Sequence, residues 1–398
     1  MDKSESEAAP GWLETRLPLC AVWRTQWRDH LVPANLTLVW SFGVLVAVAL
    51  GVLTLSGIWL GFAYVPTTQG AALSIERYTR AVNFGWLIRD LHRDGATMLF
   101  GVVFIELFRG IYYGSYRNRR ELAWIIEVVR FFAFLAVGFF GFAMTGGAVA
   151  DAAVTIMAAH IAAIPLFGSA LAHWFLGGFM VGSATAPRLA MAHEAIGFLV
   201  LLIALLGFMA SRAAPPANPD GIAVPDPRDM VPQSAYAGKL FTAFMIFALI
   251  FAVIVAFAPG LGQPAGMSLT SPMAMPVQPV PPWYLLGFHG LARAGQSAGG
   301  GTLLTVAALV LLGALPWLDQ GIVASGRYRP LYAGFVIVLA IDWVVLSVAA
   351  AQPATGIWPA VIDIATIYVF VHFIVITPLV TMLERAHPVP ARIARRTA

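Results

Sequence analysis

The sequence contains a single cysteine, Cys20, and few charged residues, and each shortage excludes a class of protein. One cysteine cannot form an internal disulfide, hold an iron–sulfur cluster alone or provide the Cys-x-x-Cys-His motif that attaches haem covalently. Only 11% of the 398 residues are charged, whereas 59% are hydrophobic, which is too apolar for an ordinary water-soluble domain. The net charge of +4 comes from loop residues on one side of the predicted spans, so we expect no nucleic-acid partner.

Long apolar runs dominate the chain, and several reach the ~20 residues that cross ~30 Å of hydrocarbon. We count about eight, near residues 39–63, 95–114, 124–144, 190–210, 240–259, 302–318, 331–350 and 359–382. The sequence therefore predicts an all-α polytopic membrane protein, with a four-helix N-terminal bundle and a four-helix C-terminal part. An even number of spans places both termini on one side of the membrane.

The basic residues of the loops predict the orientation. They fall mainly on the side of the N-terminus, which the positive-inside rule assigns to the cytoplasm; they are Arg117, Arg119, Arg120, Arg212, Arg228, Lys239, Arg327 and Arg329. The chain begins without the basic-then-apolar layout of a cleaved signal peptide. Residues 12–30 mix apolar side chains with arginines, which suits a helix in the membrane interface, although a loose amphipathic leader is the alternative. We expect a multi-pass protein of a bacterial inner membrane with both termini cytoplasmic.

Two histidines, His92 and His193, lie at the outer ends of the second and fourth predicted spans. Both spans run inward, so the two imidazoles are expected at similar depth. Two neutral imidazoles that face each other are what a six-coordinate haem iron needs. Arg89 and Arg188 lie three and five residues earlier, and their guanidinium groups suit the propionates of a haem. The alternative is that each histidine is an interfacial residue with satisfied hydrogen bonds.

Glycines on the first predicted span add a second indication. Gly43 and Gly57 are fourteen residues apart, which is about 21 Å of helix and nearly the same helical face. A flat macrocycle needs a helix surface without side chains beside it. Small residues that allow close helix packing are the alternative explanation.

Successive landmarks along nearly the whole chain resemble the cytochrome b subunit of cytochrome bc complexes. They are VNFGWLIRDLHRDGA, FRGIYYGSY, AIPLFGSALAHWFLGGF, APRLAMAH, PPWYLLGF, PWLDQGIVASGRYRPL and TPLVTMLER. The resemblance implies eight transmembrane helices, with two b haems in the first four. It also implies quinol oxidation at an outer site, quinone reduction at an inner one, and a dimer with an iron–sulfur protein and a c-type cytochrome. The implied parts are an interfacial segment 1–35, a haem-binding bundle 36–212 and a C-terminal membrane domain 213–398.

By this resemblance, His92 and His193 match the ligand pair of the outer, low-potential haem, with Arg89 and Arg188 beside them and Gly57 and Gly141 facing them. The inner haem is where the sequence departs from the family pattern. The family has a second histidine fourteen residues after each outer ligand, but those positions hold Glu106 and Gly207. Glu127 stands where the family has its inner glycine on the third span.

A carboxylate in hydrocarbon is costly unless it is paired or protonated. Arg109 and Arg130 lie within one turn of Glu106 and Glu127 along the sequence. We therefore predict that these four side chains form one cluster in the vacated inner haem site. The alternative is four separate side chains that reach toward water. A replacement metal site is disfavoured, because two carboxylates without a histidine make a poor transition-metal cage.

The quinone sites of the family also differ here. Its Pro-Glu-Trp-Tyr signature reads Pro281, Pro282, Trp283 and Tyr284, so the acidic residue is missing, and Phe142 matches a tyrosine. His289 is a candidate replacement for the lost proton acceptor, although a surface or loop histidine is the favoured alternative. At the inner site, the family's His and Asp are matched by Arg212 and Leu240, while Lys239 remains.

The sequence thus predicts a mono-haem cytochrome b-like subunit that holds one haem b, with quinone or quinol as a second candidate ligand. It would pass electrons between a periplasmic-side partner and quinone without a full quinone cycle. We expect lipid around it, a homodimer within a larger complex, and an iron–sulfur protein, c-type cytochrome or dehydrogenase as partner. One alternative is a non-catalytic membrane anchor or scaffold. Another is a transporter using Glu106 and His372, although His372 is expected to make a structural contact with Asp342.

Overall fold

The computed structural model of the chain describes residues 11–223, 225–264 and 279–393. Eight helical segments of this described part are long and apolar enough to cross a membrane. They are Leu38–Gly61, Gly85–Tyr112, Glu121–Ala143, Thr185–Ala213, Gln233–Phe257, Ala298–Leu318, Pro330–Ala350 and Trp358–Leu383. The predicted all-α membrane fold is therefore confirmed.

Most of these segments are single α-helices. They are α5 (Gly85–Tyr112), α6 (Glu121–Ala143), α9 (Thr185–Ala213), α12 (Ala298–Leu318) and α13 (Pro330–Ala350). The first span joins the 3₁₀ turn η2 (Leu38–Ser41) to α3 (Phe42–Gly61), and the fifth joins η4 (Gln233–Tyr236) to α10 (Ala237–Phe257). The last span runs through α14 (Trp358–Val371), the π-helix η7 (His372–Ile376) and α15 (Thr377–Leu383).

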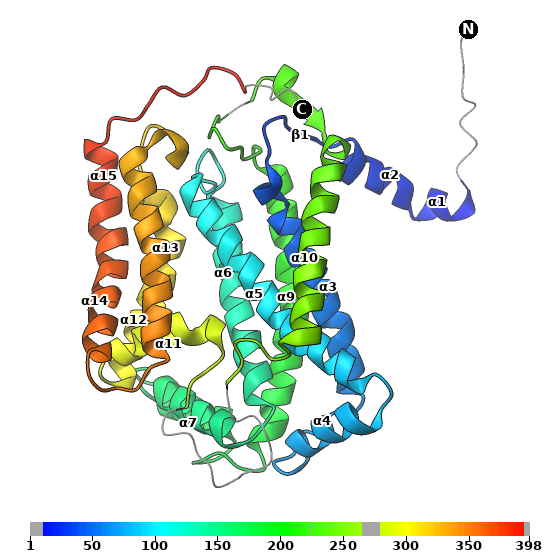
Figure 1. Cartoon of the computed structure of the whole chain (residues 1–398), viewed down its shortest axis with the longest axis vertical. Helices are drawn as coiled ribbons and strands as arrows, with labels where there is room; N and C mark the ends of the chain where they lie inside the picture. Colours follow the sequence, from blue (N-terminus) through cyan, green and yellow to red (C-terminus); the bar gives the residue numbers. More distant parts are fainter. Residues whose placement is uncertain (1–10, 224, 265–278, 394–398) are drawn as a thin grey trace.

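Shorter elements connect the spans. They are α4 (Gly70–Ala81), α7 (Ala148–Ala162), α8 (Gly168–Leu176), η3 (Pro227–Asp229), η5 (Trp283–Leu285), α11 (Leu286–Ala294) and η6 (Gly326–Tyr328). Strands β1 (Leu31–Pro33) and β2 (Met230–Pro232) form a small antiparallel ribbon. Figure 1 shows this ribbon at the upper end of the bundle, whereas α4 and α7 lie at the lower end.

Two helix pairs build the N-terminal bundle. Helix α3 packs against α5, and α6 packs against α9. In the C-terminal part, α11 packs against α12, α13 and α14. Helix α10 belongs to the C-terminal half of the chain but packs against α3 and α5, so one continuous hydrophobic core joins the two halves. The predicted domain boundaries remain a prediction.

Two spans begin earlier than the apolar runs suggest. Helix α5 begins at Gly85 and α9 at Thr185, rather than near residues 95 and 190. A count of apolar residues misses the start of α5, because the first turns of this helix contain charged residues. Asp90 and Asp94 are paired there with Arg93. His92 therefore lies two turns inside α5 rather than at its end.

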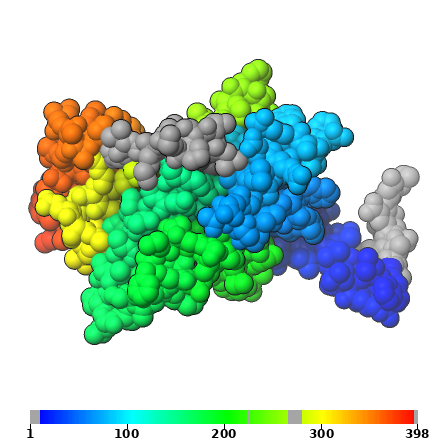
Figure 2. All heavy atoms as spheres, turned by 90° about the horizontal axis from the view of Figure 1, so that it is seen from below, coloured from blue at the N-terminus to red at the C-terminus, as the bar shows by residue number. Residues whose placement is uncertain are grey.

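The N-terminal segment contains α1 (Trp12–Arg16), α2 (Leu19–Trp23) and the π-helix η1 (Arg24–Arg28), drawn in dark blue at one side of the molecule in Figure 2. Helices α1 and α2 project away from the bundle, whereas Trp27 of η1 stacks on Phe208 of α9 at 6.2 Å between ring centres. Trp12 and Trp23 are exposed in this segment. Exposed tryptophans beside arginines are typical of a segment in the membrane interface, and the interfacial position of this segment stays a prediction.

A buried carboxylate, Asp319, ties the upper ends of the helices together. It accepts hydrogen bonds from the Tyr116 hydroxyl (2.6 Å), Arg329 Nη1 (2.9 Å) and the Thr381 hydroxyl (3.1 Å). Arg329 also pairs with Glu384 at 3.3 Å. Burial alone would raise the pKa of Asp319, but the hydrogen bonds from Arg329 and Tyr116 outweigh it and hold that pKa below its ordinary value.

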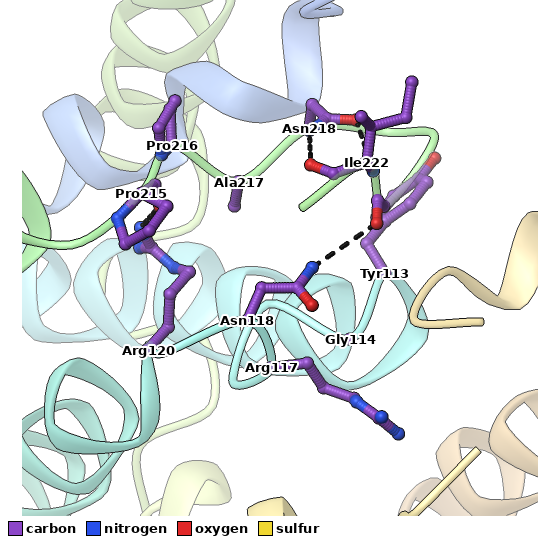
Figure 3. A pocket seen from close by; sticks show the side chains of 11 residues that line it. Tyr113, Gly114, Arg117, Asn118, Arg120, Pro215, Pro216, Ala217, Asn218 and Ile222 are labelled. Carbon is purple, nitrogen blue, oxygen red and sulfur yellow. Dashed lines mark hydrogen bonds between the residues drawn. The ribbon is translucent and has the colours of Figure 1, made fainter. Parts of the chain in front are cut away.

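A shallow pocket at the same end lies between the loop after α5 and the loop after α9 (Figure 3). Arg120 Nη1 donates to the Pro215 carbonyl, and Asn118 Nδ2 donates to the Gly221 carbonyl at 3.4 Å. Both donors line the pocket, and both hydrogen bonds join the two loops. The residues around the pocket therefore hold the ends of the N-terminal bundle together.

Candidate functional site

His92 on α5 and His193 on α9 face each other inside the N-terminal bundle. Their ring centres are 6.0 Å apart and the ring planes are at 80°. Because a metal–imidazole bond is about 2 Å and a ring nitrogen lies about 1 Å from the ring centre, a shared metal needs ring centres about 6 Å apart. The observed separation matches this requirement.

Hydrogen bonds select the same tautomer in both rings. His92 Nδ1 lies 3.0 Å from the Leu53 carbonyl oxygen, and His193 Nδ1 lies 3.0 Å from the Val137 carbonyl oxygen. A carbonyl oxygen can only accept, so each Nδ1 carries the proton and donates it. Each neutral ring therefore keeps an unprotonated Nε2, the nitrogen that a metal can bind.

Glycines give the two rings their space. A Cβ atom added at Gly57 would lie 2.8 Å from Cε1 of His92, and one at Gly141 would lie 2.8 Å from Cε1 of His193. Any other residue would push the imidazole aside at either position. The pair of rings, the common tautomer and the two glycines together fit the axial ligands of a haem iron.

The two predicted arginines lie in the first turns of the helices that carry the histidines. Arg89 Nη1 lies 3.6 Å from Asp90 Oδ1. Arg188 donates to the backbone carbonyl of Trp174. Each arginine precedes its histidine on the same helix, Arg89 on α5 and Arg188 on α9.

A charged cluster lies farther along the same helices. Arg130 Nη2 on α6 pairs with Glu106 Oε2 on α5 at 3.0 Å and also with Glu127. Arg109 Nη2 lies 3.8 Å from Glu106 Oε1. The four side chains are mostly buried and lie in one cluster. They do not extend separately toward water.

The cluster faces the first span as the histidine pair does. A Cβ atom added at Gly43 would lie 3.1 Å from Glu106 Oε1, and the Arg109 guanidinium lies 4.9 Å from the centre of the Trp40 ring. Gly207 on α9 faces α6, where an added Cβ atom would lie 3.5 Å from Cγ2 of Ile126, the residue before Glu127. Glu106 therefore packs against Gly43 in the same way that His92 packs against Gly57.

The candidate quinone residues Trp283, Tyr284 and Phe142 have different packing partners. Tyr284 is buried, stacks on Phe100 at 4.0 Å between ring centres and donates to the Gly138 carbonyl at 3.3 Å. Trp283 Nε1 donates to Thr97 at 3.4 Å. Phe142 packs instead in a small separate cluster with Val149 and Ala150.

Two expectations about other histidines are wrong. His289 does not lie in a loop: it is a half-buried residue of α11, and its Nε2 is buried without a hydrogen bond in the described part of the chain. Burial, with Arg293 and His160 nearby, lowers the pKa of His289 to about 4, so the ring is neutral near pH 7. No hydrogen bond or ion pair joins His372 to Asp342 in the described residues, and a buried atom of each lacks a partner.

Sequence reasoning missed the groups that hold the rings. Ser56 lies beside His92, with its hydroxyl oxygen 3.1 Å from Nδ1. The Leu53 and Val137 carbonyls each precede a facing glycine by four residues. A backbone carbonyl that accepts a hydrogen bond cannot be recognised from the sequence. Ser56, directly before Gly57, could have been recognised as a candidate hydrogen-bond partner of His92.

Comparisons with known proteins agree along the chain. Residues 27–214 match the family described as "Cytochrome b/b6/petB", and residues 269–370 match "Cytochrome b(C-terminal)/b6/petD". "Cytochrome b" of Rhodospirillum rubrum is 35% identical over 385 residues, which cover 96% of this chain and 95% of that protein.

A longer relative and a solved structure extend the match. "Cytochrome b/c1" of Bradyrhizobium diazoefficiens is 32% identical over 395 residues, which cover 99% of this chain but 58% of that protein. A chain of the solved structure "Hyperthermophilic respiratory Complex III" has the same fold, with a TM-score of 0.85 and 28% identity over 94% of this chain and 98% of its own length. On these matches and its eight candidate spans, the chain is a multi-pass membrane protein that belongs to the cytochrome b family.

Proposed function

We propose that the chain is a mono-haem cytochrome b subunit of a respiratory complex. It would pass electrons between a periplasmic-side partner and the quinone pool. The observation that carries this proposal is the contrast between two positions on the same helices. At the outer position two imidazoles face each other with bare Nε2 atoms, whereas at the inner position Glu106 is paired with Arg130.

Haem b, when bound, supplies an iron that gains and loses one electron. In this proposal His92 and His193 would hold the iron through Nε2, while the Leu53 and Val137 carbonyls keep the rings in the required tautomer. Gly57 and Gly141 leave room for the rings to lie against their helices. Arg89 and Arg188 are the candidates for pairing with haem propionates.

The inner cluster supports a single haem. Arg130 pairs with Glu106 and Glu127, and in this proposal the three side chains would fill the place that the resemblance assigns to a second haem. Electrons then have no second iron on the inner side, so a complete quinone cycle through this subunit is excluded by the proposal. Electron transfer is confined to the half of the membrane that contains His92 and His193.

The partners follow from that position. A relative is named "Cytochrome b/c1", and a structural neighbour belongs to a respiratory Complex III. We propose an iron–sulfur protein, a c-type cytochrome or a dehydrogenase on the periplasmic side, with the chain as a homodimer and both termini in the cytoplasm. Quinone would meet the subunit near the candidate residues Trp283, Tyr284, His289 and Phe142.

Haem content tests the proposal directly. Pyridine haemochrome analysis of the purified complex should give one b haem per copy of this chain, and His92→Ala should abolish it. The matched control is His173→Ala, because His173 is an exposed histidine on α8 and its loss should leave the haem in place. Two haems per chain would contradict the assignment of the inner cluster. No haem at all would favour the scaffold alternative.

A second measurement tests the missing quinone cycle. With an antimycin-type inhibitor present, addition of oxidant should cause no extra reduction of haem b, because no second haem receives an electron. Extra reduction under these conditions would show a second acceptor within the subunit and would overturn the mono-haem assignment.

A further inference from the structure

The two histidine rings are held in nearly the same way by two different helices. On α3, the Leu53 carbonyl accepts from His92 four residues before Gly57. On α6, the Val137 carbonyl accepts from His193 four residues before Gly141. One helical turn separates carbonyl and glycine in each case, so both lie on one helix face.

Ser56 breaks this symmetry. Its hydroxyl oxygen lies 3.1 Å from His92 Nδ1, whereas the corresponding residue before Gly141 is Phe140, which has no polar atom to offer His193. Ser56 is buried, so water does not compete for its hydroxyl. The N–H of His92 therefore has two acceptors, and that of His193 has one.

The direction of the Ser56 hydrogen bond follows from its other partners. The hydroxyl has one proton, and it lies 2.6 Å from the Val52 carbonyl oxygen, which can only accept. That proton is therefore committed to the helix backbone, as in other serines that bond the carbonyl four residues earlier. Toward His92 the Ser56 oxygen acts as an acceptor.

We propose that Ser56 is a positioning residue that lowers the reduction potential of the site through His92. This inference rests on the proposed ligation of haem iron by His92. A second acceptor on Nδ1–H increases the electron density of the ring and makes Nε2 a stronger donor. A stronger donor favours the oxidised iron, because second-shell hydrogen bonds are among the groups that set haem potentials.

The test is a redox titration of the purified complex that carries Ser56→Ala. The Leu53 carbonyl still fixes the tautomer, and alanine suits a helix, so haem content and the α-band should be unchanged. The ratio of reduced to oxidised haem at a fixed ambient potential should rise about two- to fivefold, or roughly 20–40 mV at 59 mV per tenfold change. Ser56→Thr keeps the hydroxyl and should restore the original potential.

Thr54→Ala is the matched control. Thr54 lies two residues earlier on the same helix, and among the described contacts its hydroxyl bonds neither ring. Its removal should not move the potential. A haem-loaded Ser56→Ala variant with an unchanged potential would overturn the role of Ser56 and leave the proposed function standing. Equal shifts in the alanine and threonine variants, or in the control, would also overturn it. Absence of haem from the unmodified complex would refute the proposed function instead.

Discussion

Replacement of Glu106 by glutamine isolates the charge that stands in place of a second haem ligand. The substitution keeps the shape of the side chain and removes its negative charge. Arg130 then loses one of its two carboxylates, and Arg109 loses the one that lies 3.8 Å away. We expect lower stability of the inner half of the N-terminal bundle, with an unchanged haem spectrum from the outer half.

The magnitude follows from the burial of the pair. The side chains of Glu106 and Arg130 are 12% and 11% exposed, and loss of one partner from a fully buried pair costs about 3–5 kcal/mol. Two features reduce this cost: Arg130 keeps its bond to Glu127, and glutamine still has an oxygen that accepts. We therefore expect a loss of about 2–3 kcal/mol, within the range for charged hydrogen bonds and buried pairs.

Thermal unfolding in mild detergent, followed by loss of the haem absorption, measures this effect. Glu76→Gln is the matched control, because Glu76 forms an i,i+4 pair with Arg80 at 2.9 Å and the Arg80 side chain is 75% exposed. Such a surface pair contributes at most about 1 kcal/mol. An equal unfolding midpoint for Glu106→Gln and the control would refute the buried-pair argument. Loss of the haem from the folded Glu106→Gln variant would show that the two sites are not separate.

Other expected outcomes concern the same bundle. The double variant Glu106→His with Gly207→His should remain mono-haem by pyridine haemochrome, because Glu127 still occupies the position of the lost glycine; a second haem would show that the space remains open. Tyr116→Phe should cost about 1–3 kcal/mol in thermal unfolding, since it leaves Asp319 with one buried hydrogen bond fewer; no change would mean that water replaces the hydroxyl. Because the folded pKa of Asp319 is below its ordinary value, its contribution to stability is complete above about pH 4 and is lost as the pH falls through the folded pKa. Asp319→Asn should therefore lower stability at pH 7 and flatten the acid limb of a stability–pH curve.

Local properties of the sequence determined most of the fold. A span needs only a run of apolar residues, because every backbone group in hydrocarbon must be satisfied within its own helix. The number and order of the spans could therefore be predicted. Their ends could not be placed well where charged pairs such as Asp94 with Arg93 occupy the first turns of a helix.

The histidine pair could also be predicted from the sequence. Helical geometry fixes the depth of His92 and His193 once the spans and their directions are known. The spacing of Gly43 and Gly57 indicated one facing glycine, whereas Gly141 was implied only by the resemblance to the cytochrome b family. The charged cluster was predictable in part, because Glu127 and Arg130 are three residues apart on one helix face.

Contacts between distant segments were decided only by the tertiary structure. The sequence does not show that Tyr284 packs on Phe100 and Gly138, or that Nε2 of His289 is buried on a helix without a hydrogen bond to any described residue. It also suggested a contact between His372 and Asp342 that the described part of the chain does not contain. In each case helix rotation and packing set the direction of a side chain, and apolar helices in lipid offer several rotations of similar hydrophobicity. The hydrogen bond from His92 to Ser56 has the same origin, since it depends on the rotation of α3 against α5.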